Sequence, residues 1–278
     1  PRMGGNLSFE ISNKTTQKKL NAADYIKSTY KPGSRIYIIR DKNFTGKGEI
    51  RITALAMAEA EGMILKIETE KIPKNTKLRW QFGGCADKRF SREGDLGVDP
   101  EDSFELKPEY CKGNIYKLHG NTFQVSFGDK NDKFLIGVFP EKSKLKIDRT
   151  LPLLKGELAL SRSKTYYMAI QIPDKTTTFK NIAKFFSPVQ HRPLTIFDTD
   201  PIYEPKSPVG ARKLFELAEA ARAKVASQLV IETPDPYFNT LGGTLSVAAD
   251  GIWSGETWLH GAVGWRMPLS GWRAAYTG

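Results

Sequence analysis

The chain has 278 residues, of which 40% are hydrophobic and 11% aromatic, so it can form one large or two ordinary folded domains. This composition excludes a disordered chain, and no run approaches the roughly 18 apolar residues that a membrane span needs. The formal net charge is +11, and because the basic and acidic residues from Ser207 onward are equal in number, the positive excess lies wholly in residues 1–206.

The positive excess has two interpretations. The lysines are scattered among threonine and asparagine, which is typical of a solvated surface. A basic face also attracts polyanions, of which sulfated glycans, uronic-acid glycans and nucleic acids are the main classes. Nucleic-acid binding is the least favoured of these, because the basic residues are not interleaved with aromatic ones and no recognition helix is evident. We therefore expect no nucleic-acid partner.

Up to about residue 200 the pattern predicts short β-strands. Runs of five to eight positions alternate apolar with polar residues or hold β-branched and aromatic ones. These runs lie in residues 34–41, 48–71, 76–84, 114–140 and 156–173. "ALAMAEAEG" (residues 54–62) has a helical composition, but its place between such runs predicts a strand, and "FGDKNDKF" (127–134) predicts a hairpin turn. Many short strands at close spacing predict an antiparallel β-sandwich.

Residues 83–114 form a long polar stretch inside the predicted sandwich. Loops of this length are functional or disordered, and Arg92 and Asp95 are its candidates for substrate contact. A calcium site is the weaker option, since the acidic residues do not follow the EF-hand spacing. Cys85 and Cys111 flank the stretch and either form one disulfide or remain two buried thiols. The histidines are far apart, so no metal cluster is expected.

Near residue 207 the periodicity changes to that of helices. Apolar residues recur at one-face spacing over residues 209–230, with Ser207 as a candidate cap. Pro234 ends this helix, and Asp235 followed by Pro236 predicts the N-cap and first residue of a second helix, which runs to about residue 250. The second helix is apolar nearly all round and contains two adjacent glycines, so we expect it to be buried and closely packed.

The last 28 residues hold four of the five tryptophans, interleaved with glycine and arginine. Pyranose rings present apolar faces on which an indole stacks, while Arg, Asn, Asp and His bond the hydroxyl groups at the ring edge. The composition therefore suits the wall of a sugar-binding pocket. Alternatively, the tryptophans are core residues that brace irregular loops.

The stretch "TPDPYFNTLGGTLSVAADGIW", followed by "WLHGAVGWRMPLSGWRAAY", resembles the start of the catalytic toroid in six-hairpin glycosidases. The nearest resemblance is to large exported glycan-degrading proteins of gut Bacteroidetes, with rhamnosidase-type enzymes more distant. The resemblance implies an α+β protein in which an antiparallel β-sandwich (residues 1–206) precedes the first helical hairpins of an (α/α)6 toroid (207–278, incomplete). The recognisable motif covers residues 231–276.

The resemblance also implies which residues contact substrate. "TPDPYFN" would face the pocket, and the segment from His260 to Arg273 would form an arginine-, glycine- and tryptophan-rich loop. The implied contacts are Asp235, Asn239, Trp253, Trp258, His260, Trp265, Arg266, Trp272 and Arg273. The loop departs from the rhamnosidase pattern, because no Asp or Glu lies between Thr257 and Gly278. Asp235 and Glu256 are the carboxylates near the motifs. For each, a role as a helix cap or as a ligand of a sugar hydroxyl is favoured over a role as catalytic acid or base.

These features predict the N-terminal part of a glycoside hydrolase that acts on a complex, acidic polysaccharide. Its catalytic carboxyl groups would come from later hairpins, so the chain alone would be inactive, and no cofactor is expected. We expect a periplasmic or extracellular protein and interpret the chain as a fragment cut at both ends. An incomplete toroid would leave the second helix and the tryptophan segment exposed or pressed against the sandwich. The alternative is a non-catalytic glycan-binding or structural β-sandwich.

Overall fold

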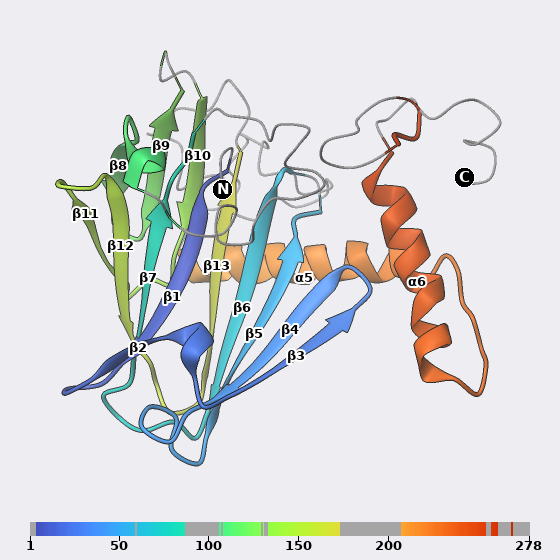
Figure 1. Ribbon diagram of the computed structural model, residues 1–278, viewed down its shortest axis with the longest axis horizontal. Coiled ribbons are helices and arrows are strands. Elements are labelled where there is room, and N and C mark those ends of the chain that lie inside the picture. The colour runs from blue at the N-terminus through green and yellow to red at the C-terminus, as the bar shows by residue number, and fades with distance from the viewer. Residues whose placement is uncertain are drawn as a thin grey trace.

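The computed structural model describes residues 4–58, 60–86, 106, 108–128, 130, 133–172, 207–253, 257–260 and 268. It is an α+β protein with three layers: a five-stranded sheet, an eight-stranded sheet and a long helix, α5 (Ser207–Ala226), on the far face of the larger sheet (Figure 1). A second helix, α6 (Pro236–Gly251), packs against α5 to form a helical hairpin. The predicted β-sandwich followed by a helical hairpin is confirmed.

Every strand pair in the described residues is antiparallel. The five-stranded sheet has the order β11 (Lys144–Asp148), β12 (Leu153–Ala159), β7 (Lys77–Gly83), β1 (Asn6–Ser12), β2 (Gln17–Lys19). The eight-stranded sheet has the order β3 (Tyr25–Lys31), β4 (Ser34–Arg40), β5 (Glu49–Ala56), β6 (Gly62–Glu70), β13 (Lys164–Gln171), β10 (Lys133–Val138), β9 (Thr122–Phe127), β8 (Ile115–His119). The short helices are η1 (Leu20–Ala22) and α3 (Pro108–Cys111).

The main core lies between the two sheets. Because side chains alternate along a strand, Leu78, Trp80 and Phe82 of β7 all point inward and are at most 2% exposed. The Trp80 ring centroid lies 4.9 Å from that of Phe139, and Phe123 stacks on Phe139 at 5.4 Å. This aromatic cluster holds the sheets together.

A second core joins the eight-stranded sheet to α5. The buried helix residues recur at positions i, i+3, i+4 and i+7, which is one face of a helix. They are Ala211, Leu214, Phe215 and Ala218, packed against Leu55, Ile64, Ile136, Val138 and Ala169. The predicted helix is therefore present, but it ends at Ala226 and not at residue 230, and Leu229 is 43% exposed.

The strand predictions are right in position and incomplete in number. The hairpin predicted at residues 127–134 is present, since Phe127 of β9 pairs with Lys133 of β10. The strand predicted through residues 54–62 stops at Ala56, where the Met57 N–H donates to the Gly62 carbonyl and closes a tight connection to β6. Strands β1, β2, β3 and β11 were not predicted.

The predicted burial of α6 is wrong for most of its surface. Only Gly242 and Gly243 are buried, and a Cβ on either would meet the 226–231 connection or Pro32 at 2.6–3.1 Å, so the glycines do permit close packing. Leu241 and Leu245 are 41% and 49% exposed because the described residues cover the helix only on its glycine side.

An ion network fixes the β3–β4 turn to α5. The Arg222 guanidinium donates to both oxygens of Glu219 at 2.8 Å and to the Pro32 carbonyl at 2.7 Å, while the Lys31 ammonium donates to Glu219 at 3.0 Å. Gly33 has φ +73°, as the third residue of a type II turn requires. A Cβ there would lie 2.8 Å from the Arg222 side chain, so the turn and the arginine pack directly together.

This network predicts an acid-dependent loss of stability. Arg222, and then Lys31, lowers the Glu219 pKa from its ordinary 4.5 to about 2, so the carboxylate stabilises the fold above about pH 4.5 and this contribution is lost as the pH falls toward 2. Because 35% of the Glu219 side chain is exposed, solvent screening reduces its contribution to the free energy of unfolding to about 1 kcal/mol. Glu219→Gln should lower the melting temperature at neutral pH and have little effect near pH 2. Glu216→Gln, in an exposed pair with Arg212, is the control. If Glu219→Gln lowered the melting temperature equally at both pH values, the ionised Glu219 carboxylate would not be the source of the stability.

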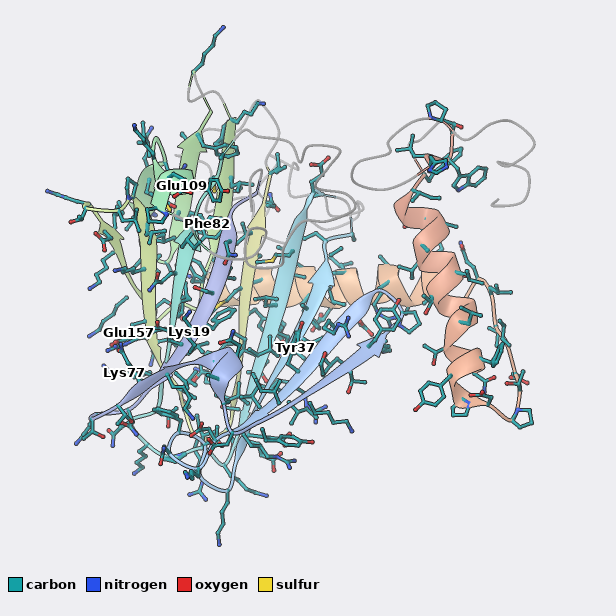
Figure 2. The ribbon with its side chains drawn as sticks, viewed as in Figure 1. Lys19, Tyr37, Lys77, Phe82, Glu109 and Glu157 are labelled. Carbon is teal, nitrogen blue, oxygen red and sulfur yellow. The ribbon has the colours of Figure 1, made fainter. Side chains whose placement is uncertain are left out.

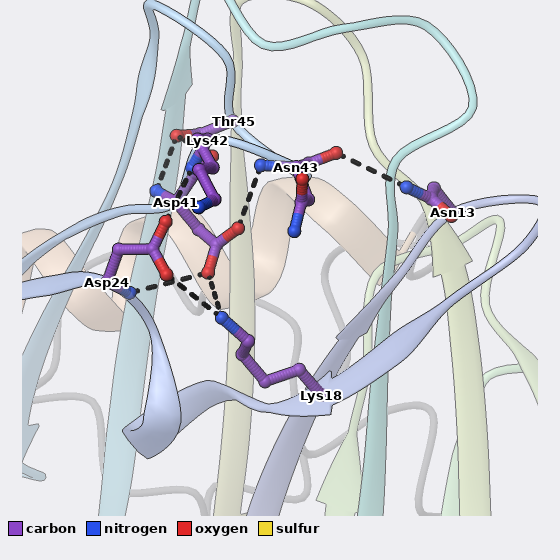
Figure 3. Close-up of polar contacts among 7 residues, drawn as sticks. All are labelled: Asn13, Lys18, Asp24, Asp41, Lys42, Asn43 and Thr45. Carbon is purple, nitrogen blue, oxygen red and sulfur yellow. Dashed lines mark hydrogen bonds and ion pairs between the residues drawn. The ribbon is translucent and has the colours of Figure 1, made fainter.

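A second polar network closes the base of the sandwich (Figure 3). The Asp41 carboxylate is fully buried and accepts from the Lys18 ammonium at 2.6 Å, from the Asn43 N–H at 2.9 Å and from the Asp24 N–H at 3.3 Å. Asp24 accepts from Lys18 and from the Lys42 N–H. Because Lys18 belongs to β2 and Asp41 follows β4, the network ties the two sheets together.

Cys85 and Cys111 are both buried, and no disulfide joins them, so the thiol alternative holds in this structure. Burial raises the pKa of the Cys85 thiol to about 12. No helix within the described ranges has the length and apolarity needed to cross a membrane.

Candidate functional site

The turn that begins α6 contains two residues of the predicted substrate site, Asp235 and Asn239. Asp235 caps the helix, since its carboxylate accepts from the Tyr237 N–H at 2.8 Å, and Pro236 is the first helical residue, as predicted. The Asn239 side-chain oxygen accepts from the N–H and hydroxyl of Thr233 at 2.7 and 2.9 Å, and its amide donates to the Thr233 carbonyl at 3.0 Å. The turn is therefore braced from both ends.

This braced turn presents aromatic rings to the outside. Tyr237 is 86% exposed and Phe238 57% exposed, although both lie in the first turn of a helix that Asp235 caps. Asn239 uses its side chain to hold Thr233, so here it positions the turn. One Asp235 oxygen caps the helix, and the carboxylate remains exposed. Such an arrangement can stack a flat apolar ligand face and accept a hydrogen bond beside it.

A second cluster lies beyond the other end of α6. Trp253 and Trp258 pair as an isolated antiparallel bridge, with ring centroids 4.5 Å apart. The Leu259 N–H donates to the Ile252 carbonyl at 2.8 Å and closes this short return of the chain. Trp253 is 44% exposed and His260 is exposed, so the tryptophan pair is only partly a core element.

The structure separates the two groups of predicted residues. Asp235 and Asn239 lie at the start of α6, and Trp253, Trp258 and His260 lie at or beyond its end, which for 16 residues is about 24 Å away along the axis. The remaining candidates lie outside the described residues: Arg92, Asp95, Glu256, Trp265, Arg266, Trp272 and Arg273. Whether Arg266 and Arg273 share a cleft with Asp235 stays a prediction.

The carboxyl groups whose pKa is shifted in the described residues lack the upward shift that a catalytic acid needs. The pKa values of Asp24, Glu49, Asp148, Glu157 and Glu219 are all lowered, chiefly by hydrogen bonds from Lys or Arg side chains or, for Asp24, from the Lys42 N–H. A general acid in glycoside hydrolysis needs the opposite shift. These groups are held in ion pairs, as with Lys77 and Glu157 at 2.7 Å (Figure 2). The described ranges also hold no cluster of three or more metal-ligating side chains.

Sequence reasoning missed a surface on the sandwich. Tyr30 and Tyr37, with Arg35 between them in space, lie exposed on β3 and β4. The signal was present in "SRIYIIRD", where Arg35 and Tyr37 are two residues apart and so share one face of the strand. The alternation in this run predicts a strand but does not indicate which part of its face another sheet covers.

Comparison with known proteins places the sandwich in a family. Residues 1–190 match the family model described as Domain of unknown function (DUF4450). The chain belongs to the DUF4450 family. The match covers the two sheets of the sandwich and ends before α5. No curated protein sequence matches the chain.

Three solved structures are similar to this DUF4450 chain at low identity. A bacterial glucoamylase complexed with acarbose has 7% identity and a TM-score of 0.48, over 88% of this chain and 34% of that one. Heparan sulfate lyase HepC from Pedobacter heparinus has 6% identity and a TM-score of 0.35, over 58% and 23%. A human-microbiome protein named as a kojibiose phosphorylase has 12% identity and a TM-score of 0.32, over 87% and 27%. The chain thus spans about a third or less of each.

Proposed function

We propose that this DUF4450 chain is the N-terminal part of an exported glycoside hydrolase that acts on a complex, acidic polysaccharide. The sandwich and α5 would support the start of the catalytic toroid, and α6 would carry one wall of the substrate pocket. The observation that carries the proposal is the braced "TPDPYFN" turn, which keeps Tyr237 and Phe238 exposed beside the Asp235 carboxylate. Because the backbone of the turn is already fixed, its ordering entropy is not lost again when a sugar binds.

The catalytic acid and base would come from outside the described residues. Cations and N–H groups lower the pKa of the shifted carboxyl groups on the sandwich and on α5, and Asp235 already caps a helix. This part of the protein would therefore bind and position the polymer, and other hairpins would supply the two catalytic carboxyl groups. A non-catalytic glycan-binding role is the second candidate, favoured by the exposed tyrosines of β3 and β4.

The first test compares the chain with the intact protein that contains it. Both are incubated with oligogalacturonate and with heparin oligosaccharides, and new reducing ends are measured. We expect release by the intact protein and none by the chain alone. Turnover by the chain alone would contradict the assignment of the carboxyl groups to other hairpins. Binding without release by the intact protein would favour the non-catalytic role.

Two substitutions in the intact protein test the pocket wall. Tyr237→Ala and Arg266→Ala should each lower kcat/KM, and for Arg266 the loss should be about 1.5–3 kcal/mol, the usual contribution of a hydrogen bond to a charged group. The melting temperature should not change for Tyr237→Ala, because its side chain is almost fully exposed in the chain. Tyr25→Ala, on the sandwich, is the control. A fall in melting temperature with unchanged kinetics would assign both residues to packing.

A further inference from the structure

The inner face of the eight-stranded sheet extends beyond the five-stranded sheet that covers it. Ile39, Ile50 and Ile52 of β4 and β5 belong to the main core and are at most 6% exposed. Tyr37 shares their face of the sheet, because it is two residues from Ile39 and pairs with Ile52, yet it is 37% exposed. Figure 2 shows Tyr37 in front of the larger sheet, beyond the edge of the smaller one. The five-stranded sheet therefore covers Ile39 and leaves Tyr37 exposed.

The uncovered part carries two tyrosines and an arginine. Tyr30 of β3 pairs across the ladder with Arg35 of β4, and Tyr37 is the next residue of β4 on the same face. The Arg35 guanidinium carbon lies 5.6 Å from the centre of the Tyr30 ring, and one N–H reaches the Ser28 hydroxyl at 3.5 Å. Tyr30 is 42% exposed. We call Ser28, Tyr30, Arg35 and Tyr37 the tyrosine face.

A second arginine–tyrosine pair lies on the opposite face of the sheet and differs from Arg35 and Tyr30 in the charge pairing of its arginine. Arg40 lies 5.4 Å from the centre of the Tyr25 ring, but it also donates to the Glu49 carboxylate at 2.8 and 3.1 Å, so its charge is already paired. Arg35 is exposed, and among the described residues no carboxylate lies within ion-pair distance of it. The tyrosine face therefore offers a guanidinium whose planar edge remains available to an anion.

We propose that the tyrosine face binds an anionic saccharide that carries carboxylate or sulfate groups, at a site separate from the proposed pocket on α6. The apolar face of a sugar ring stacks on Tyr37 or Tyr30, and Arg35 donates charge-assisted hydrogen bonds to the acidic group of the same or the next residue. The open sheet admits a polymer that continues in both directions. The positive excess in residues 1–206 adds long-range attraction for such a chain.

This inference rests on the proposed function for its choice of a glycan, but the two can fail separately. The proposed function is tested by bond cleavage in the intact protein, and the tyrosine face is tested by binding to the chain itself. A hydrolase that never uses this face would still release reducing ends. A chain without hydrolase activity would still bind the saccharide in a binding titration if the tyrosine face is the site.

The experiment is isothermal titration of the chain with oligogalacturonate, which carries only carboxylates, and with a heparin oligosaccharide, which also carries sulfates. We expect Arg35→Ala and Tyr37→Ala each to weaken binding about tenfold, the effect of losing one charge-assisted bond or one stacked ring. Binding by the unmodified chain should weaken with salt, and less steeply for Arg35→Ala. The melting temperature of each variant shows that it is folded.

Tyr25→Ala is the matched control, because it removes a tyrosine of similar exposure on β3 that lies beside the paired Arg40, on the other face of the sheet. It should bind as the unmodified chain does. Equal losses for Tyr25→Ala and Tyr37→Ala would overturn the proposal, as would equal affinity for neutral maltoheptaose or failure of both acidic saccharides to bind. Binding to single-stranded DNA alone would replace the glycan by a nucleic acid. If Tyr37→Ala does not fold, Arg35→Ala and Arg35→Lys decide the outcome.

Discussion

Replacing Asp41 with alanine should lower the free energy of unfolding by about 3–5 kcal/mol, because the change leaves charged and polar partners without their buried acceptor. The carboxylate has no exposed surface and holds three donors, one of them the ammonium of Lys18. Its main-chain carbonyl also accepts from the N–H groups of residues 44–46, so the β4–β5 connection is organised around this one residue. Urea denaturation with one fluorescence probe measures the loss.

The neighbouring Asp24 supplies the control. It also contacts Lys18, at 3.1 Å, but its side chain is 41% exposed, so water replaces the partners that Asp24→Ala removes. We expect a clearly smaller loss for Asp24→Ala than for Asp41→Ala. Similar losses would mean that general surface charge, and not the buried acceptor, stabilises the base of the sandwich. Asp41→Asn should fall between them, since an amide oxygen still accepts from the backbone but an amide cannot pair with Lys18.

Trp80→Ala should lower the free energy of unfolding by a similar amount, about 3–5 kcal/mol, because it leaves a cavity in the main core. The indole is 1% exposed and packs on Phe139, and its cross-strand partner in β12 is Gly156. A Cβ on Gly156 would overlap the indole ring, so the glycine provides the space that the indole fills. Trp253→Ala, which removes a half-exposed indole, is the control and should cost far less.

A double-mutant cycle makes this prediction specific. Gly156→Ala alone should destabilise the chain by about 1–3 kcal/mol, because the added methyl group overpacks against the indole. In the Trp80→Ala background the same change should cost little or nothing, since the cavity accepts the methyl group. Additive losses would show that the glycine is required for its backbone conformation and not for the space it leaves. Urea denaturation of all four proteins gives the coupling energy.

The kinds of secondary-structure element and much of their order can be predicted from the amino-acid sequence. Alternation at period two predicted β4, β6 and β7, because one face of each strand is buried and the other is not fully covered. Local chemistry predicted the start of α6, since Asp235 and Pro236 act within one turn of the helix. The strand β3 was missed because all its residues are exposed, which leaves no apolar alternation to detect. The strand β11 was missed although its five residues, "KLKID", do alternate polar with apolar side chains.

Which surfaces are covered depends on how the elements pack together, and sequence patterns do not show this. The apolar pattern of α6 predicted burial, but burial depends on a neighbour, and the described residues supply one only at Gly242 and Gly243. Likewise Ile39 and Tyr37 share one face of one strand, yet the smaller sheet and η1 end between them, so one is core and the other is an exposed ring. Among the residues that the structure describes, Arg35 has no carboxylate partner, because Glu49 lies beside Arg40 on the opposite face of the sheet. Secondary structure follows from short-range periodicity, whereas exposure and charge pairing are set by segments distant in sequence.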